Sequence, residues 1–301
     1  MFGRRTAAPP AGPNRKPRDN EIDIHGLTHS GKVRKENQDH FLICALKKQM
    51  VIYETSLPRT EHLVVDPQRF AFLMMVADGV GGAAKGADAS RLALEAVTQY
   101  VAHSTRCYYA ATSQNDEEFT EALQEAAVLC HAQLLREGAG NAECRGMATT
   151  LTLFLGAWPR AYLLQVGDSR CYLLRQGELT QISRDQTMAQ DLVDLGVMTR
   201  ADASKSRLAH TLSSSIGGRS PAPVVTALDI EWGATVLLCS DGLTNHVSDE
   251  RIRDRLRSMK SAKQVCEDLL KEALDGGGHD NITIIVGRAL PDASAPSRSL
   301  P

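Results

Sequence analysis

An apolar run that ends in one carboxylate restricts the fold of this chain more than any other feature of its sequence. Residues 72–77 are all apolar, Asp78 follows them, and three of the next four residues are glycine. A short, continuous apolar run is typical of a buried strand, whereas a carboxylate at its end is costly to remove from water. The fold must therefore bring this strand end to a place where the charge of Asp78 is compensated.

The same juxtaposition of an apolar run and an aspartate recurs four times along the chain. Asp241 follows the run at 235–240, Asp168 separates two apolar runs, and Asp280 and Asp39 stand in front of two more. Any single Asp-Gly pair is explained most simply as a turn. One turn does not explain five carboxylates far apart in sequence, and they would repel one another if the sheets bring them together. We therefore expect cations among them.

The residue types indicate which cations and which chemistry such a site would serve. Carboxylate, carbonyl and water oxygens are the ligands that Mg²⁺ and Mn²⁺ prefer, and the sequence offers zinc no Cys/His cluster. Because Gly79 has no side chain, its carbonyl could approach a metal closely. A carboxylate-rich site for two metals activates water and neutralises a phosphoryl group. Arg34, five residues before Asp39, is the candidate cation for the phosphate.

Strand-like and helical patterns alternate in groups along the chain. We expect strands at 39–48, 69–78, 148–158, 160–179, 235–242 and 281–288, and helices at 88–101, 117–135, 249–259 and 261–274. Strand groups that alternate with helix pairs predict an α+β domain in which the helices pack outside the sheets. The segment 52–68 fits no periodic template, and we expect it to be a long hairpin connection.

Composition and charge argue against a nucleic-acid-binding, a membrane-spanning or a secreted protein. The net charge of −2 gives no basic field for nucleic acid, and no apolar run is long enough to span a membrane. Residues 1–20, which are basic and Pro-rich, and residues 291–301 are expected to be disordered tails around one domain at 21–290. The N-terminus lacks the apolar core of a secretory signal. The seven cysteines form no Cys-x-x-Cys pair, which predicts reduced thiols in a cytoplasmic protein.

Six short motifs, in this order, together resemble one known family. They are GKVRKENQD (31–39), VADGVGG (76–82), GMATTLTL (146–153), VGDSRCYL (166–173), CSDGLTN (239–245) and HDNITIIV (279–286). The chain resembles, from about residue 21 to 290, the metal-dependent PPM/PP2C-type protein Ser/Thr phosphatases in their bacterial form. The resemblance implies a four-layer αββα sandwich, with two mainly antiparallel sheets flanked by helix pairs.

The resemblance also implies a role for each carboxylate in holding two tightly bound Mg²⁺ or Mn²⁺ ions. On the family pattern Asp78 bridges both metals, and the carbonyl of Gly79 binds the second. Asp241 and Asp280 hold the first metal. Asp39 holds the second metal through water.

Three further residues acquire roles from the same resemblance. Arg34 binds the phosphate of the substrate. Asp168, together with Asp241, resembles the ligands of a third, weaker metal, although its side chain could instead cap the tight turn in which it lies. Asn281 would support the ligands from behind, or it is simply a turn residue before a strand.

The sequence departs from the family pattern in three places. Val80 stands where many eukaryotic members carry a histidine proposed as general acid, so a metal-bound water would have to protonate the leaving group. Gln38 is neutral where some members have Glu. Asp185-Gln186-Thr187 replaces the usual Asp-His-Ser at the segment leading into the flap, and residues 204–223 match the family poorly. None of the nine histidines is given a role, and only His279, beside Asp280, is placed near the metals.

The expected function is hydrolysis of phosphoserine and phosphothreonine on proteins, through in-line attack by a water that bridges two divalent cations. The alternative is a catalytically weak or inactive module of the same fold that binds a phosphoprotein or a kinase. A module of that kind would be expected to lack core ligands, whereas Asp78, Asp241 and Asp280 are all present. The expected substrates are phosphoproteins of a Ser/Thr kinase, and the protein is expected to be a monomer.

Overall fold

The computed structural model describes residues 15–48, 68–80, 83–103, 116–141 and 144–291, and these form two antiparallel sheets packed face to face. The first sheet has the order β1 (Ile22–His29), β11 (Ile282–Ala289), β10 (Thr235–Cys239), β7 (Arg170–Arg175) and β8 (Glu178–Gln181). The second has the order β2 (Asp39–Lys48), β3 (Gln68–Val80), β5 (Leu151–Ala157), β6 (Arg160–Val166) and β9 (Val224–Asp229), and β4 (Ala148–Thr149) pairs with the end of β3. Every neighbouring pair in both sheets is antiparallel.

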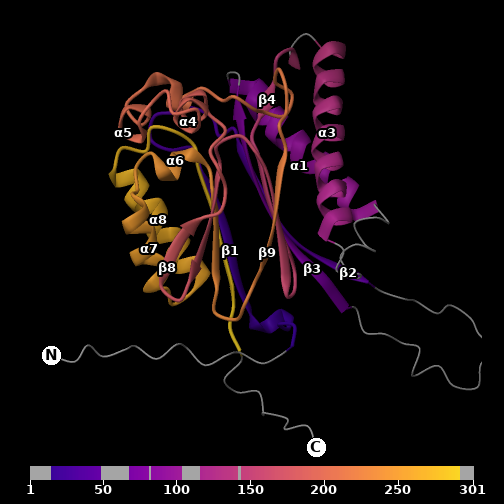
Figure 1. The fold of residues 1–301 in the computed structure, drawn as a ribbon, viewed down its shortest axis with the longest axis vertical. Helices are drawn as coiled ribbons and strands as arrows, with labels where there is room; N and C mark the ends of the chain where they lie inside the picture. Colours follow the sequence, from indigo (N-terminus) through magenta and orange to yellow (C-terminus); the bar gives the residue numbers. More distant parts are fainter. Residues whose placement is uncertain (1–14, 49–67, 81–82, 104–115, 142–143, 292–301) are drawn as a thin grey trace, which may run out of the picture.

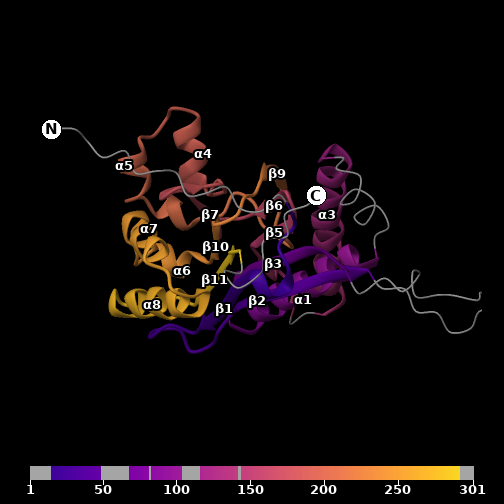
Figure 2. The same ribbon diagram turned by 90° about the horizontal axis from the view of Figure 1, so that it is seen from below.

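Two pairs of long helices cover the outer faces of the sheets. Figures 1 and 2 show α1 (Ala83–His103) and α3 (Asp116–Gly140) outside the second sheet. On the other side α7 (Asp249–Arg257) and α8 (Ala262–Asp275) lie against the first sheet. The side chains of Ser248 and Ser261 cap the last two helices at their N-termini, which explains where both begin. The predicted four-layer αββα sandwich is therefore confirmed.

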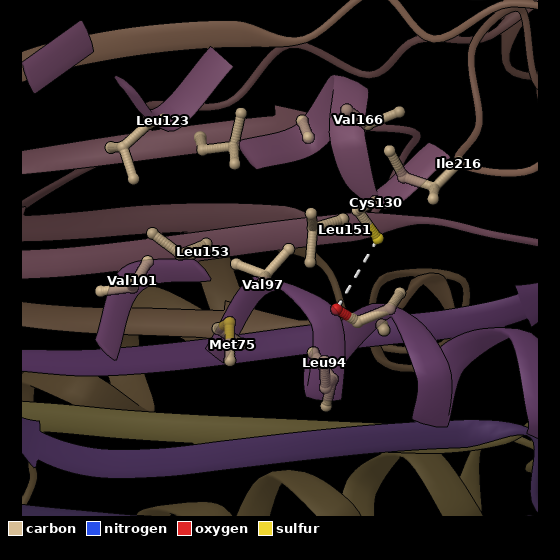
Figure 3. Close-up of a cluster of buried hydrophobic side chains, with 14 of the residues drawn as sticks. Met75, Leu94, Val97, Val101, Leu123, Cys130, Leu151, Leu153, Val166 and Ile216 are labelled. Atoms are coloured by element: carbon tan, nitrogen blue, oxygen red, sulfur yellow. Dashed lines mark hydrogen bonds between the residues drawn. The ribbon is translucent and has the colours of Figure 1, made fainter. Parts of the chain in front are cut away.

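Three apolar layers fill the spaces between these four layers. Figure 3 shows the layer between the second sheet and helices α1 and α3, with Met75, Leu94 and Leu123 among its members. A second layer lies between the sheets, and a third lies under α7 and α8. Successive residues of β3 alternate between layers, since Met75 faces the helices and Met74 faces the other sheet. Both faces of β3 are thus buried, which is why its sequence reads as a continuous apolar run.

The structure corrects several sequence-based expectations. Strand β3 does not end at Asp78, because Gly79 and Val80 continue the ladder and pair with β4. The run at 160–179 contains the expected tight turn at Asp168 and a second turn after β7, which divide it into β6, β7 and the start of β8. Strands β1 and β9 were not expected. The same is true of three short helices, α4 (Met188–Asp194), α5 (Arg200–Ala203) and α6 (Asp241–Thr244).

The chain is also ordered earlier than residue 21. Lys16 donates to the carbonyl oxygens of Arg69 and Phe70, and Arg15 pairs with Glu21. These polar contacts hold residues 15 and 16 at the edge of the sandwich, within the segment 1–20 that sequence analysis assigned to a tail. Residues 1–14 and 292–301 lie outside the described residues, as does the expected hairpin connection at 52–68 except for its last residue.

Two further expectations concern the thiols and the membrane. All six cysteines in the described part of the chain are free thiols, and Cys107 falls outside it. Within the same described ranges, no helix combines the length and the apolar character that are needed to cross a bilayer.

Candidate active site

Asp39 and Asp78 face each other at the same end of two paired strands. They are direct partners in the antiparallel register of β2 and β3. The backbone of Asp78 is fixed from the other side, because its N–H donates to Thr150 Oγ1 at 2.9 Å and its carbonyl accepts from Thr149 Oγ1 at 2.8 Å. Two carboxylates that sequence analysis placed at separate strand ends are therefore neighbours on one sheet.

The Asp39 carboxylate is buried with one oxygen satisfied and the other not. Asp39 is only 2% exposed. Asp39 Oδ2 accepts from Ser240 Oγ and from Thr283 Oγ1, both at 2.7 Å. Asp39 Oδ1 is buried and has no hydrogen-bond partner among the described residues. Burial raises the pKa of this carboxyl to about 6 despite the two hydroxyl donors. A buried, unpartnered carboxylate oxygen fits a site that holds a cation.

Three more aspartates approach this pair from other elements. Asp168 lies in the turn between β6 and β7, Asp241 is the first residue of α6, and Asp280 lies just before β11. Burial, and then the charges of these three and of Asp39, raise the pKa of Asp78 well above its ordinary value. Burial and the nearby Asp241 carboxylate likewise raise the pKa of Asp168 to about 7. The structure thus brings all five predicted carboxylates within electrostatic reach of one another.

Arg34 lies at the mouth of this carboxylate cluster. Its guanidinium donates from Nε to Asp280 Oδ1 at 2.9 Å and from Nη2 to Asp280 Oδ2 at 2.7 Å. The hydrogen bonds and charge of Asp280, followed by the charges of Asp241 and Asp78, raise its pKa further. The side chain remains 56% exposed. A cation of this kind is both near the anions and open to a ligand from solvent.

Asn281 is more than a turn residue. It is 4% exposed, and its side chain spans the loop that carries Arg34. Asn281 Oδ1 accepts from the backbone N–H of Gln38 at 2.8 Å, and Nδ2 donates to the carbonyls of Ser30 at 3.1 Å and Glu36 at 2.9 Å. This amide therefore sets the position of the Arg34 loop relative to Asp280.

Position 79 requires a glycine because α1 packs directly against it, apart from any role of the Gly79 carbonyl. A Cβ at this position would lie 2.1 Å from the carbonyl oxygen of Gly86, in the first turn of α1. A Cβ on Gly86 would in turn lie 2.9 Å from the carbonyl oxygen of Gly79. The two glycines let the start of α1 cross the end of β3 directly beside the carboxylates.

The donor set fits hard divalent cations that retain water. No three His, Cys, Asp or Glu side chains in the described chain form a ready-made cage around one ion. Mg²⁺ does not need such a cage, because it usually keeps several waters and is held through one or two carboxylates. The orphaned Asp39 Oδ1 and the mutually raised pKa values both indicate a deficit of positive charge. Cations would relieve that deficit.

Several residues near the cluster were missed by sequence analysis. Ser240 and Thr283 donate to Asp39, and Thr150 accepts from the N–H of Asp78. All three lie inside recognised motifs, and Ser240 and Thr283 are hydroxyl residues close to an aspartate in the sequence. Burial and the charge of Asp280 raise the pKa of Asp241, and the nearby His210 acts in the opposite direction. It lies in η3 (Arg207–His210), in a segment that matches the family poorly, so no sequence signal was available for it.

His279 and Val80, which sequence analysis discussed in relation to the metals, lie in the following surroundings. The His279 backbone N–H donates to His246 Nε2 at 3.1 Å, and the two imidazole rings lie 5.0 Å apart. The Val80 side chain is 41% exposed beside the cluster and supplies no proton donor.

Comparisons with known proteins agree with this geometry. A sequence model described as "Protein phosphatase 2C" matches residues 59–276. The serine/threonine protein phosphatase PstP of Mycobacterium tuberculosis is 37% identical over 219 residues, which are 72% of this chain and 40% of PstP. The protein phosphatase PhpP of Streptococcus pneumoniae is 30% identical over 264 residues, which are 87% of this chain and 96% of PhpP. The crystal structure of the catalytic domain of PstP with two manganese ions has 30% identity and a TM-score of 0.68, and it covers 89% of this chain and 98% of that one. The chain therefore spans about 40% of the length of its Mycobacterium tuberculosis relative.

Proposed function

The chain belongs to the protein phosphatase 2C family, and from this we propose that it is a metal-dependent phosphatase that hydrolyses phosphoserine and phosphothreonine on proteins. The observation that carries the proposal is the convergence of five carboxylates, one of which has a buried and unpartnered oxygen, with an exposed arginine at their edge. Such a site attracts divalent cations and then a phosphate dianion. It offers no comparable partner to a neutral substrate.

The proposed cofactors are Mg²⁺ or Mn²⁺, two of them bound tightly and a third more weakly. Asp78, the carbonyl of Gly79, Asp241 and Asp280 would hold the tight pair, with Asp39 acting through water. When bound, such ions lower the pKa of water and neutralise charge that develops on phosphoryl oxygens. Support for a pair comes from the solved structure of the PstP catalytic domain, which contains two manganese ions.

The protein side chains contribute binding and orientation. In the hydrolysis, a water oxygen forms a bond to phosphorus while the ester P–O bond breaks, and the departing side-chain oxygen takes up a proton. We propose that Arg34 holds two phosphoryl oxygens through its planar guanidinium, of which Nε and Nη2 donate to Asp280 in this structure. Asn281 fixes the loop of Arg34 through three hydrogen bonds, so the position of the bound phosphate depends on this amide as well.

Metal dependence tests the proposal directly. Purified protein is assayed on a phosphothreonine and a phosphotyrosine peptide, with Mn²⁺, with Mg²⁺ and with excess chelator. We expect turnover of the phosphothreonine peptide that chelator abolishes and added cation restores. Asp78→Asn should lose this activity and the bound metals together, whereas Asp254→Asn on α7 should retain both. Full activity in excess chelator would falsify the metal-dependent reaction.

The proposal extends to partners and location. The substrates are phosphoproteins of a Ser/Thr kinase, which is supported by the family and by the names of the relatives PstP and PhpP. A reducing, cytoplasmic location is supported by the free thiols of the six described cysteines. We propose that the protein acts as a monomer.

A further inference from the structure

Gln186 is a buried glutamine that joins three separate pieces of backbone. It lies at the start of the flap, which we define as residues 185–222, between β8 and β9. Its side chain is 5% exposed. Gln186 Oε1 accepts from the N–H of Gly167 at 2.8 Å, and Nε2 donates to the carbonyl of Ala222 at 2.8 Å. The backbone N–H of Gln186 donates to the carbonyl of Gly167 at 3.0 Å. One residue therefore ties both ends of the flap to the residue before Asp168.

The turn that contains Asp168 is also held from its other side. Gly167 has a φ of +106°, and a Cβ there would lie 2.6 Å from Thr150 Cγ2. Thr150 Oγ1 is 2.8 Å from Ser169 Oγ and also accepts from the N–H of Asp78. Thr150 thus restricts the movement of the turn on the side of Asp78. Gln186 restricts it on the side of the flap, through its hydrogen bond with Gly167.

A second buried glutamine strengthens the same connection. Gln165, 3% exposed, donates from Nε2 to the carbonyls of Gly167 at 3.2 Å and Ser169 at 3.3 Å. Gln165 Oε1 accepts from the N–H of Arg184 at 2.9 Å, just before the flap begins. Two amide side chains therefore link the turn of Asp168 to the base of the flap.

We propose that Gln186 is a positioning residue that sets the place of the Asp168 carboxylate and of the flap together. The inference rests on the proposed function, in which Asp168 binds the weaker metal. The amide side chain offers both the acceptor that Gly167 needs and the donor that Ala222 needs. Replacement by an apolar side chain would leave the N–H of the buried Gly167 without its partner. It would also remove the donor to the carbonyl of Ala222, which is an exposed residue. Gln186 is also the residue that stands in place of the histidine usual in this family.

The flap has its own internal bonds, so loss of the amide should not unfold it. The carbonyl of Gln186 accepts from the N–H of Ser213, Thr187 pairs with Leu212, and the N–H of Met188 donates to the carbonyl of Thr211. The variants described next therefore test the position of the Asp168 turn and of the flap, and not whether the protein folds.

The experiment compares Gln186→Leu and Gln186→Glu with a control on the flap, Gln190→Leu. Gln190 makes a side-chain hydrogen bond to Asp194 on the exposed surface of α4. Two quantities are measured on each protein. The first is hydrogen exchange at the Gly167 amide, which needs no activity. The second is the calorimetric isotherm for Mn²⁺, which separates tight from weak binding.

We expect exchange at Gly167 to accelerate about tenfold or more in Gln186→Leu, because one buried hydrogen bond is lost. Gln186→Glu keeps the acceptor and should protect Gly167, while the amides around Ala222 exchange faster. Weak Mn²⁺ binding should fall about tenfold in Gln186→Leu while the tight sites and the control remain as in the wild type. Unchanged exchange at Gly167 in Gln186→Leu would overturn the hydrogen-bond assignment. Faster exchange with unchanged weak binding would overturn the link to Asp168.

These outcomes are distinct from a failure of the proposed function. If the wild type binds Mn²⁺ and hydrolyses no phosphopeptide, the proposed function fails, whereas the exchange and binding data still decide the role of Gln186. If Gln186→Leu does not fold, Gln186→Glu decides through exchange near Ala222, and wild-type exchange there would overturn the proposal.

Discussion

Arg34 is the side chain proposed to bind the phosphate of the substrate. Its bidentate contact with a phosphoryl group would be charge-assisted, worth on the order of 1.5–3 kcal/mol. We expect Arg34→Ala to lower kcat/KM by roughly ten- to a hundredfold, and Arg34→Lys to recover only part, because an ammonium lacks the planar fork. Steady-state kinetics on a phosphothreonine peptide measure this.

Stability and metal binding distinguish this role from a surface ion pair. Arg34 pairs with Asp280 and not with Glu36 or Asp39, and it is largely exposed. An exposed pair contributes roughly 0–1 kcal/mol to folding, so Arg34→Ala should unfold at nearly the wild-type denaturant concentration and bind both tight metals. The matched control is Lys35→Ala, the neighbouring exposed cation. Equal kinetics for the two variants would refute the phosphate role of Arg34.

Two hypotheses for Asp168, a turn cap and a metal ligand, predict different results for its substitution. If it only caps its turn, Asp168→Ala should cost about 1 kcal/mol of stability and leave turnover per folded molecule unchanged. If it holds the weaker metal, the variant should lose little stability, because removal of one clustered anion relieves repulsion. Turnover would then fall by one to several orders of magnitude, roughly 1.4 kcal/mol of barrier per tenfold. We expect the second result, and metal counting by calorimetry with the turnover number decides it.

The aspartates of the carboxylate cluster could be predicted from sequence, whereas the residues that support them could not. Each aspartate of the cluster adjoins an apolar run, and this pattern is visible without a structure. Gln186 and His210 act across the fold, through Gly167 and Asp241, which are distant in sequence. Such contacts arise from the arrangement of strands and the flap, and no local pattern encodes them.

Among the elements, the crossing of β3 and α1 depends on two glycines. Gly79 does not have a positive φ, so the cost of a side chain there is steric: an alanine Cβ would lie 2.1 Å from the carbonyl oxygen of Gly86. We expect Gly79→Ala to destabilise the protein by roughly 1–3 kcal/mol and to lower activity, because α1 must move away from the carboxylates. Urea unfolding in chelator gives the stability.

A second glycine provides the control for this experiment. A Cβ at Gly140, the last residue of α3, would meet nothing within 4 Å. Gly140→Ala should therefore leave stability unchanged or raise it by up to about 1 kcal/mol, since alanine favours a helix. If Gly79→Ala behaves like Gly140→Ala, α1 and β3 do not need the close contact.

Elements with a continuous apolar run or a clear cap were the predictable ones. Strands β3 and β10 read as continuous apolar runs, and helices α7 and α8 begin at serine caps. Strand β9 has no fully buried residue, and its pattern is too weak to separate from a loop. The short helices of the flap are fixed by local caps and tertiary contacts, which periodicity does not detect.

Across the whole molecule, the two ends of the sandwich differ in how their charges are arranged. At one end Lys47 and Arg69, near the far ends of β2 and β3, bind Asp19 of the N-terminal segment. At the other end the same two strands present Asp39 and Asp78 to each other. Figure 1 shows these ends as the lower and upper edges of the sheets. Ion pairs stabilise the first end, whereas mutual repulsion strains the second unless cations are bound.

That repulsion predicts how stability depends on pH when chelator keeps the protein free of divalent cations. Folding raises the pKa of Asp39 from 3.8 to about 6 and that of Asp168 to about 7. The folded state therefore binds more protons than the unfolded state between about pH 4 and pH 7. Their stabilising contribution is complete below the unfolded pKa and is lost as the pH rises through the folded values. Burial lowers the pKa of His40 and His131, which acts in the opposite direction over the same interval.

Comparison with Asp39→Asn removes the contribution of the histidines, because both proteins contain them. In chelator, the free energy of unfolding of Asp39→Asn should rise relative to the wild type by roughly 1.4 kcal/mol from pH 5 to pH 7.5, since the variant has no charge to bury. With saturating Mn²⁺ at pH 7.5 the order should reverse, because ions that bind only the folded wild type stabilise it by mass action. Denaturant titrations at the two pH values, with and without Mn²⁺, provide the four differences. A stability difference between the two proteins that is the same under all four conditions would show that Asp39 carries the same charge in the folded and unfolded states between pH 5 and pH 7.5, and that it takes no part in binding cations.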